Sequence, residues 1–115
     1  MSITMDVKRD KPLDDGSYRA ILRSIDEKDT VYGERLMWLF WVEEHSAEVA
    51  GFTSLSPSTQ ANAYLWAVAL NPAIASKKRW TSDEVIGREC ILVVETVDSS
   101  KGKKNKIVKV KPINA

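Results

Sequence analysis

The segment Arg35-Leu-Met-Trp-Leu-Phe-Trp-Val42 is the part of the chain from which the fold can be worked out. It carries two of the four tryptophans and one of the two phenylalanines. An apolar run of this length forms either a buried strand or a buried helix segment. The aromatic content, the preceding Tyr32-Gly33 and the absence of a helix cap favour a strand.

Side chains alternate between the two faces of such a strand. One face carries Leu36, Trp38, Phe40 and Val42, and the other carries Met37, Leu39 and Trp41. Both faces are therefore apolar, which differs from the polar outer face of a half-exposed strand. A helix, a curled sheet or a ligand is expected to cover the second face.

Four more strands are predicted on either side of this segment. With the segment itself as the second strand, the five are expected at 17–25, 35–42, 48–55, 88–97 and 106–112. A bulge is expected near Ser24, where the alternation of the first strand breaks. Gly51 within the third strand indicates a kink or a close backbone approach. The charged segments 26–34 and 98–105 are predicted to be loops.

One helix is predicted at 59–70, between a cap at Ser56-Pro57 or Ser58 and the stop signal Asn71-Pro72. Its expected apolar stripe consists of Ala61, Tyr64, Leu65, Val68 and Ala69. A helix between the third and fourth of five antiparallel strands matches the OB-fold, a partly open five-stranded barrel. An SH3-like small barrel and an open α+β sheet are the alternative folds.

Length and composition indicate one globular domain, expected at 16–115 after a flexible arm at 1–15. The single cysteine, Cys90, lies in an apolar run and is expected to be a buried structural thiol, which fits a reducing, cytoplasmic setting. No signal-peptide core and no membrane-spanning segment is apparent in the sequence. We therefore expect a cytoplasmic protein.

Several short motifs from Gly16 onward occupy turn and core positions. They are Gly16-x-Tyr18-x-Ala20, Tyr32-Gly33-x-x-Leu36-x-Trp38-x-Phe40-x-Val42, Ser56-Pro57 with Leu65-Trp66, Ile86-Gly87-Arg88-x-Cys90, and Asn105 before Val108-x-Val110-x-Pro112. The pattern resembles small phage and prophage OB-fold proteins described as single-stranded-DNA-binding or replication-associated. The resemblance implies the same fold and a related role, in the host cytoplasm if the chain is phage-encoded.

Charge is distributed unevenly, although the net charge is only +1. All 16 acidic residues precede Lys101, and the last 15 residues hold six lysines: Lys101, Lys103, Lys104, Lys106, Lys109 and Lys111. Val108 and Val110 are expected to face inward, with Lys109 and Lys111 outward. A flexible arc of ammonium groups beside an OB-fold groove would follow a phosphate backbone. Alternatively, these lysines guard an edge strand.

Arginines and aromatic rings provide the remaining candidate contacts. Arg19, Arg23 and Arg35 lie on neighbouring strands, where guanidinium groups grip phosphates or pair with surface carboxylates. Trp41, Tyr32 and Phe52 are the candidate base-stacking rings. Trp38 and Phe40 are assigned to the core, and Trp66 and Trp80 to packing of the helix and its connector.

Enzymatic patterns are sparse. The lone His45 has neither a second histidine nor a cysteine with metal-ligand spacing, and Lys101-Gly102-Lys103 does not match a phosphate-binding loop. We expect no catalysis, no cofactor and no metal. The predicted function is binding of single-stranded DNA, or RNA, with little sequence preference. The alternative is a protein–protein adaptor, a homo-oligomer or a phage regulatory protein that uses the outer face of the second strand.

Overall fold

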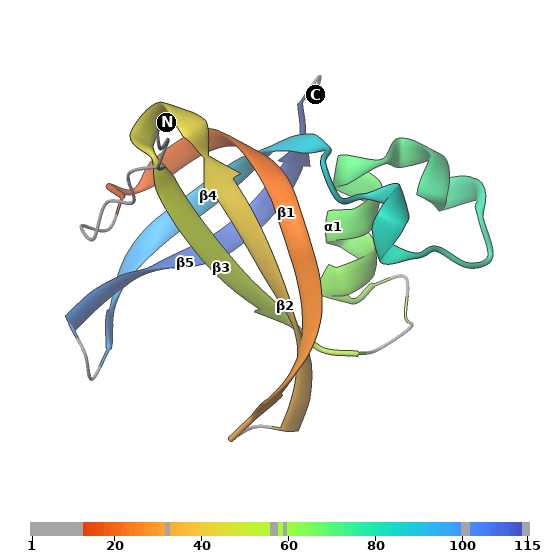
Figure 1. Cartoon of the computed structure of the whole chain (residues 1–115), viewed down its shortest axis with the longest axis horizontal. Helices are drawn as coiled ribbons and strands as arrows, with labels where there is room; N and C mark the ends of the chain where they lie inside the picture. Colours follow the sequence, from red (N-terminus) through yellow and green to blue (C-terminus); the bar gives the residue numbers. More distant parts are fainter. Residues whose placement is uncertain (1–12, 32, 56–57, 59, 100–101, 114–115) are drawn as a thin grey trace, which may run out of the picture.

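Five antiparallel strands and one α-helix make up the main elements of the computed structural model, which describes residues 13–113 apart from 32, 56–57, 59 and 100–101. The strands are β1 (Gly16–Thr30), β2 (Gly33–Val42), β3 (Ala47–Thr53), β4 (Glu89–Ser99) and β5 (Gly102–Pro112). The helix α1 (Asn62–Leu70) lies between β3 and β4, as predicted (Figure 1). A short 3-10 helix at Glu43–His45 connects β2 to β3, and two more, Pro72–Ser76 and Ser82–Glu84, lie between α1 and β4.

The strands form one sheet with the order β3-β2-β1-β4-β5. The predicted mainly β class, the antiparallel neighbours and the position of the helix are confirmed. The sheet curls strongly, so that β3 and β5 approach one another (Figure 1). No backbone ladder joins these two strands in the described residues. The sheet is therefore open at β3 and β5, and closure into a barrel is not established.

The inward face of β2 forms the centre of the core, as its alternation predicts. Trp38, Phe40 and Val42 are each at most 1% exposed. The Trp38 ring stacks on Phe40 with centroids 6.5 Å apart and meets Trp66 edge to face at 5.4 Å. Its indole N–H donates a hydrogen bond of 2.9 Å to the hydroxyl of buried Thr53, which satisfies the polar end of the ring.

Gly51 allows the helix and the two outer strands to pack closely. A Cβ atom at this position would lie 2.7 Å from Cδ1 of Ile107 and 2.7 Å from Cη2 of Trp66. The predicted close backbone approach at Gly51 is therefore confirmed. The bulge expected near Ser24 is also confirmed, because the β1–β2 register breaks between Leu22 and Ser24.

The predicted apolar stripe of the helix is only partly correct: Ala69 is buried and Tyr64 and Val68 pack against the core, but Leu65 does not. The buried residues are Ala63, Trp66, Ala67, Ala69 and Leu70, while Leu65 is 48% exposed. The large Trp66 ring sets the rotation of α1, because it fills the space over Gly51 and against Trp38. The helix also begins at Asn62 rather than at 59. Ser58 accepts a hydrogen bond of 3.1 Å from the amide of Gln60 just before the helix, and the proposed Ser56-Pro57 cap lies outside the described residues.

Both predicted charged loops are shorter than expected. Strand β1 continues to Thr30 and pairs with β2 up to Gly33, and β4 and β5 remain paired up to Ser99 and Gly102. Paired strand replaces most of each loop, because backbone N–H and C=O groups, which every non-proline residue carries, make the bonds of the ladder. Gly33 and Gly102 have φ values of 100° and 108°, which the remaining turns require.

The β5 strand turns Val108 outward, contrary to the expectation. The β4–β5 register shifts between Val93 and Val94, so Ile107 and Val110 are buried and Val108 is 50% exposed. The bulge inserts one residue and reverses the alternation beyond it.

The beginning of the described chain is fastened to β4 and β5. The Leu13 amide donates to Oδ1 of Asn105 at 2.9 Å, and Nδ2 of Asn105 donates to the Leu13 carbonyl at 2.8 Å. The Thr96 amide donates to Oδ1 of Asp15 at 2.6 Å. Leu13 itself is buried. The rest of the predicted flexible arm, residues 1–12, lies outside the described residues.

Candidate nucleic-acid interface

The outer face of β2 continues across β3 as an apolar surface. Trp41 pairs with Glu48, Leu39 with Ala50, and Met37 with Phe52. Met37, Leu39 and Trp41 are half-buried, and Phe52 is 46% exposed. Directly opposed residues share a face of the sheet. Two of the predicted stacking residues, Trp41 and Phe52, therefore lie on one surface.

Arg23 covers one face of Trp41. It occupies the β1 bulge, and its guanidinium carbon lies 4.6 Å from the centroid of the indole. This geometry gives a cation–π interaction, worth about 0.5–1 kcal/mol at an exposed site. Two predicted site residues are therefore in direct contact.

A groove runs between β3 and β5. It has a volume of about 510 Å³, and Phe52, Ala50 and Glu48 line it on one side. Lys104 and Lys106 line the opposite side, and Trp66 of α1 is part of its wall. This space, called the seam groove below, brings a predicted stacking ring and two predicted phosphate contacts to the same place.

The lysines of β5 occupy a regular strand rather than a flexible loop, so that part of the prediction is wrong. Lys103 lies opposite Asp98, and Lys106 lies opposite Glu95. The residues opposite Lys104, Lys109 and Lys111 are the apolar Val97, Val93 and Ile91. The strand fixes the spacing of these ammonium groups, and two of the five lysines face a carboxylate across the ladder.

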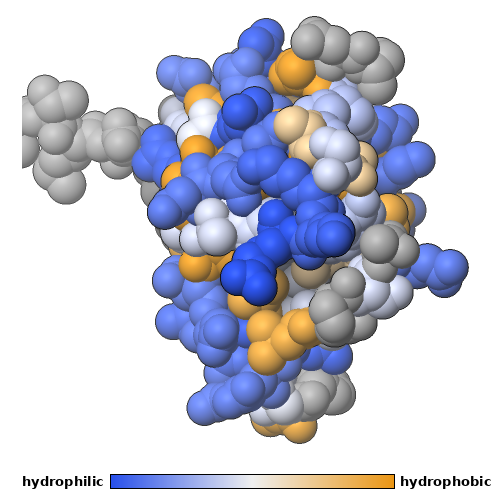
Figure 2. Space-filling view, turned by 90° about the vertical axis from the view of Figure 1, so that its right-hand side faces the viewer, coloured by the Kyte–Doolittle hydropathy of each residue, from blue (hydrophilic) through white to orange (hydrophobic). Residues whose placement is uncertain are grey.

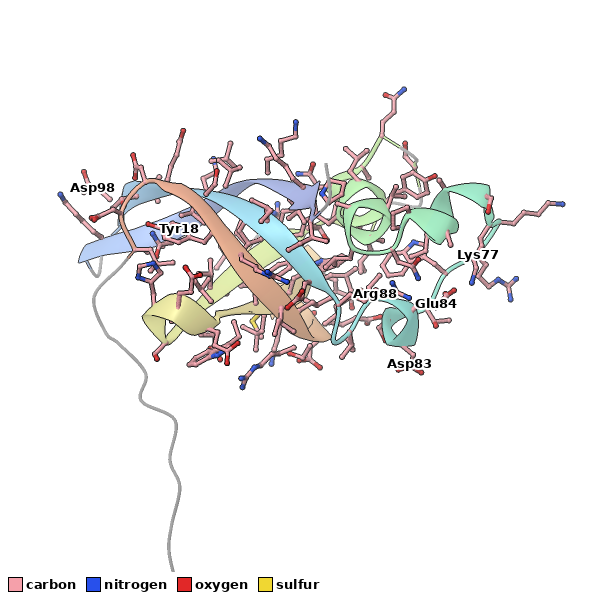
Figure 3. All side chains as sticks on the ribbon, turned by 90° about the horizontal axis from the view of Figure 1, so that it is seen from above. Tyr18, Lys77, Asp83, Glu84, Arg88 and Asp98 are labelled. Carbon is pink, nitrogen blue, oxygen red and sulfur yellow. The ribbon has the colours of Figure 1, made fainter. Side chains whose placement is uncertain are left out.

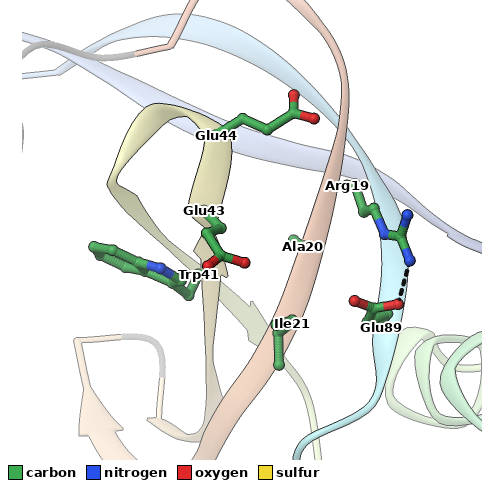
Figure 4. A pocket seen from close by; sticks show the side chains of 7 residues that line it. All are labelled: Arg19, Ala20, Ile21, Trp41, Glu43, Glu44 and Glu89. Carbon is green, nitrogen blue, oxygen red and sulfur yellow. Dashed lines mark hydrogen bonds and ion pairs between the residues drawn. The ribbon is translucent and has the colours of Figure 1, made fainter.

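Arg19 is paired with a carboxylate. Its guanidinium binds Oε2 of Glu89 at 2.6 Å, and this hydrogen bond raises the pKa of Arg19 above its ordinary value. The pair borders a cavity of about 290 Å³ that also has Glu43, Glu44 and Trp41 in its lining (Figure 4). The carboxylates of this cavity repel phosphate, so Arg19 fits the surface ion pair that the sequence left as its alternative.

Two predicted site residues, Tyr32 and Lys101, lie outside the described residues. Arg35 lies on β2 directly opposite Lys28 of β1. The sequence pattern does not indicate Lys28 as a site residue, because it predicts a loop at 26–34 where the structure has paired strand. Continuing the strand alternation of β1 past Ile25 would have placed Lys28 on the outer face.

The face that carries α1 has a different character. It is mostly hydrophilic, with separate hydrophobic patches (Figure 2). Lys77 binds the carboxylate of Glu84, and Arg88 donates to the Glu84 carbonyl at 3.1 Å (Figure 3). The hydrogen bond from Lys77 lowers the pKa of Glu84 below its ordinary value. The basic connector at 77–79 is thus partly occupied in holding the 3-10 helices together.

Cys90 is buried, as predicted, and burial raises the pKa of its thiol from 9.0 to about 12. The folded chain keeps a proton that the unfolded chain loses above pH 9.0, so the free energy of unfolding falls as the pH rises from there to about 12. We expect a loss of about 1.4 kcal/mol per pH unit from this group. Urea unfolding of the native chain and of Cys90→Ala between pH 9.0 and about 12 measures this loss of stability. The difference between the two curves should be pH-dependent; parallel curves would contradict the assignment.

No group of three or more His, Cys, Asp or Glu side chains in the described parts of the chain is arranged to hold a metal ion. Within the same parts, no helix has the length and hydropathy needed to cross a membrane. No protein-family model matches the chain, and no curated protein sequence matches it. The geometry of the β2–β3 face and the seam groove is therefore the basis for assigning a function.

Proposed function

We propose that this protein is a non-catalytic binder of single-stranded DNA with little sequence preference. One observation carries the proposal: the apolar outer face of β2 and β3, with Trp41 and Phe52, opens into a groove lined by Lys104 and Lys106. Aromatic rings that bases can stack on and cations that contact the phosphates are the two components that bind single-stranded nucleic acid. An OB-like sheet presents its ligand on the face of the second and third strands.

The rings supply contacts that do not depend on sequence. Every base has a face that stacks on an aromatic ring, worth about 1–3 kcal/mol per base. Phe52 is exposed beside the seam groove and can accept a base directly. Trp41 already holds Arg23 on one face, so a base that takes this place releases the guanidinium to bind the adjacent phosphate.

The charges set the path of the backbone. Lys104 lies opposite apolar Val97, so its ammonium group has no carboxylate directly across the ladder. Glu48 on the β3 side of the groove and Glu43 and Glu44 beyond Trp41 repel phosphate. The proposed path therefore keeps the phosphates on the β5 side of the groove and the bases over β2 and β3.

Fluorescence anisotropy of a labelled oligo-dT in a salt series tests the proposal. Each phosphate contact contributes about 0.7 to the slope of log affinity against log salt for a single strand. Three to four contacts, from Lys104, Lys106, Arg23 and Arg35, predict a slope of about −2 to −3. Absence of binding at low salt would refute the proposal. The same titration with oligo-rU compares DNA with RNA.

A protein partner on the same face is the second candidate. Met37, Leu39 and Phe52 form a continuous apolar surface, which is also suited to a protein interface. This function predicts a concentration-dependent dimer or a complex in light scattering that persists at high salt, and no binding of oligo-dT. A monomer that binds oligo-dT would exclude it in favour of nucleic acid.

A further inference from the structure

The β1–β2 hairpin places side chains of like charge opposite one another. Lys28 lies directly opposite Arg35, and Asp29 lies directly opposite Glu34. Like charges placed directly opposite one another on neighbouring strands destabilise the pair. The two strands continue together to Thr30 and Gly33, and the hairpin projects beyond the rest of the sheet (Figure 1). We call residues 26–30 with 33–37 the ribbon.

The ribbon separates most of its charges by face. Alternation along β2 puts Arg35 on the same face as Met37, and the register puts Lys28 beside Arg35. Asp26 lies opposite Met37 and is on this face too. It lies between the bulge and the pair formed by Lys28 and Arg35. The opposite face carries three carboxylates: Glu27, Asp29 and Glu34. The face of Lys28 and Arg35 is thus continuous with the apolar outer surface of β2, while most of the acidic groups point away from it.

We propose that Lys28 and Arg35 together form a second phosphate contact, which extends the strand-binding face along the ribbon. This inference rests on the proposed function. A phosphate between the two cations offsets their mutual repulsion. The acidic face keeps the polyanion on one side of the ribbon only. Lys28 is the residue that this contact adds to the site.

Length dependence follows from the distance along β2. Trp41 lies six residues from Arg35, which is about 20 Å in an extended strand. Phe52 lies opposite Met37, only two residues from Arg35. A short oligonucleotide therefore covers either Trp41 and Phe52 or Phe52 and the ribbon, whereas a longer one contacts all three. The contribution of Lys28 is therefore expected to be larger for the longer oligonucleotide, because a short one that loses the ribbon contact still binds on Trp41 and Phe52.

The experiment measures the affinity of oligo-dT of about 4 and about 15 nucleotides, a span that covers the usual footprint of one such domain. We expect Lys28→Glu to weaken binding of the longer oligonucleotide about tenfold and to change binding of the shorter one less than about twofold. Its melting temperature should not fall, because the introduced carboxylate would face Arg35 with the opposite charge. Lys28→Gln, which removes the charge without reversing it, should weaken binding less.

Two controls isolate the face of the ribbon. Lys78→Glu makes the same charge change on the exposed connector after the 3-10 helix at Pro72–Ser76, and should leave the affinity within about twofold. Glu27→Lys adds a cation on the acidic face of the ribbon and should strengthen binding little. Equal losses for Lys28→Glu and Lys78→Glu would overturn the inference. So would a gain from Glu27→Lys as large as the loss from Lys28→Glu. Failure of the native chain to bind either oligonucleotide refutes the proposed function itself.

Discussion

Replacing Trp38 with alanine is expected to lower the free energy of unfolding by about 3–5 kcal/mol, which is a large part of the stability of about 5–15 kcal/mol that is typical of a domain. Trp38 is fully buried and contacts the rings of Phe40, Trp66 and Trp80. Its removal leaves a cavity at the place where β2, α1 and the connector meet. Urea unfolding followed by circular dichroism measures the loss.

Trp38→Phe separates packing from hydrogen bonding at the same position. The smaller ring still fills part of the space, but the Thr53 hydroxyl loses the donor that lies 2.9 Å away. An unpaired buried hydroxyl costs about 1–3 kcal/mol, so this variant should be intermediate. A loss below about 1 kcal/mol for Trp38→Ala would contradict the assignment of the β2 inner face to the core.

Replacing Phe52 with alanine is expected to weaken binding of oligo-dT by about 5- to 150-fold, which corresponds to the loss of one base–ring contact. Phe52 is 46% exposed and lines the seam groove beside Lys104 and Lys106. Because the ring makes limited contact with the core, the melting temperature should change little. Anisotropy titrations of both proteins at the same salt concentration measure the effect.

Leu65→Ala is the matched control for this prediction. Leu65 is 48% exposed and lies on α1, but it is not one of the residues that line the seam groove. Its removal should leave the affinity unchanged. Equal affinities for native protein and Phe52→Ala would place the bases elsewhere, and equal losses for Phe52→Ala and Leu65→Ala would indicate an effect on folding instead.

Alternation in β2 was sufficient to predict the centre of the fold. An apolar residue at every position from Leu36 to Val42 required burial of one face and partial cover of the other, and the burial of Trp38 and Phe40 confirms this. Gly51 was informative for a similar reason, since only a missing side chain allows the Trp66 ring to lie so close. Both features depend on local sterics, which a single sequence records directly.

Features that depend on pairing were harder to predict. The ribbon and the β4–β5 hairpin are rich in charged residues, and their strand conformation comes from the partner strand rather than from their own composition. The outward turn of Val108 follows from a register shift that involves both strands. The rotation of α1 was missed because the choice of face depends on where the Trp66 ring fits.

The candidate site was predicted only in part, because its arrangement also depends on the pairing between strands. Residue types identified Trp41, Phe52 and the lysines, and the fold places Phe52, Lys104 and Lys106 around one groove. Arg19 has the same side chain as Arg23, yet one lies against Glu89 and the other against Trp41. The different surroundings of these two arginines depend on how β1 pairs with β2 and β4. This register is set by contacts between strands, so the sequence of β1 alone does not reveal it.

An NMR titration of the ¹⁵N-labelled protein with oligo-dT tests the central claim most directly, because it observes each of the four indole N–H groups separately. The account predicts that the Trp41 indole signal and the amides of Leu39, Phe52 and Lys104 shift, while the indole signal of fully buried Trp38 stays in place. Shifts confined to the connector at 77–79, or no shift at saturating oligonucleotide, would contradict it.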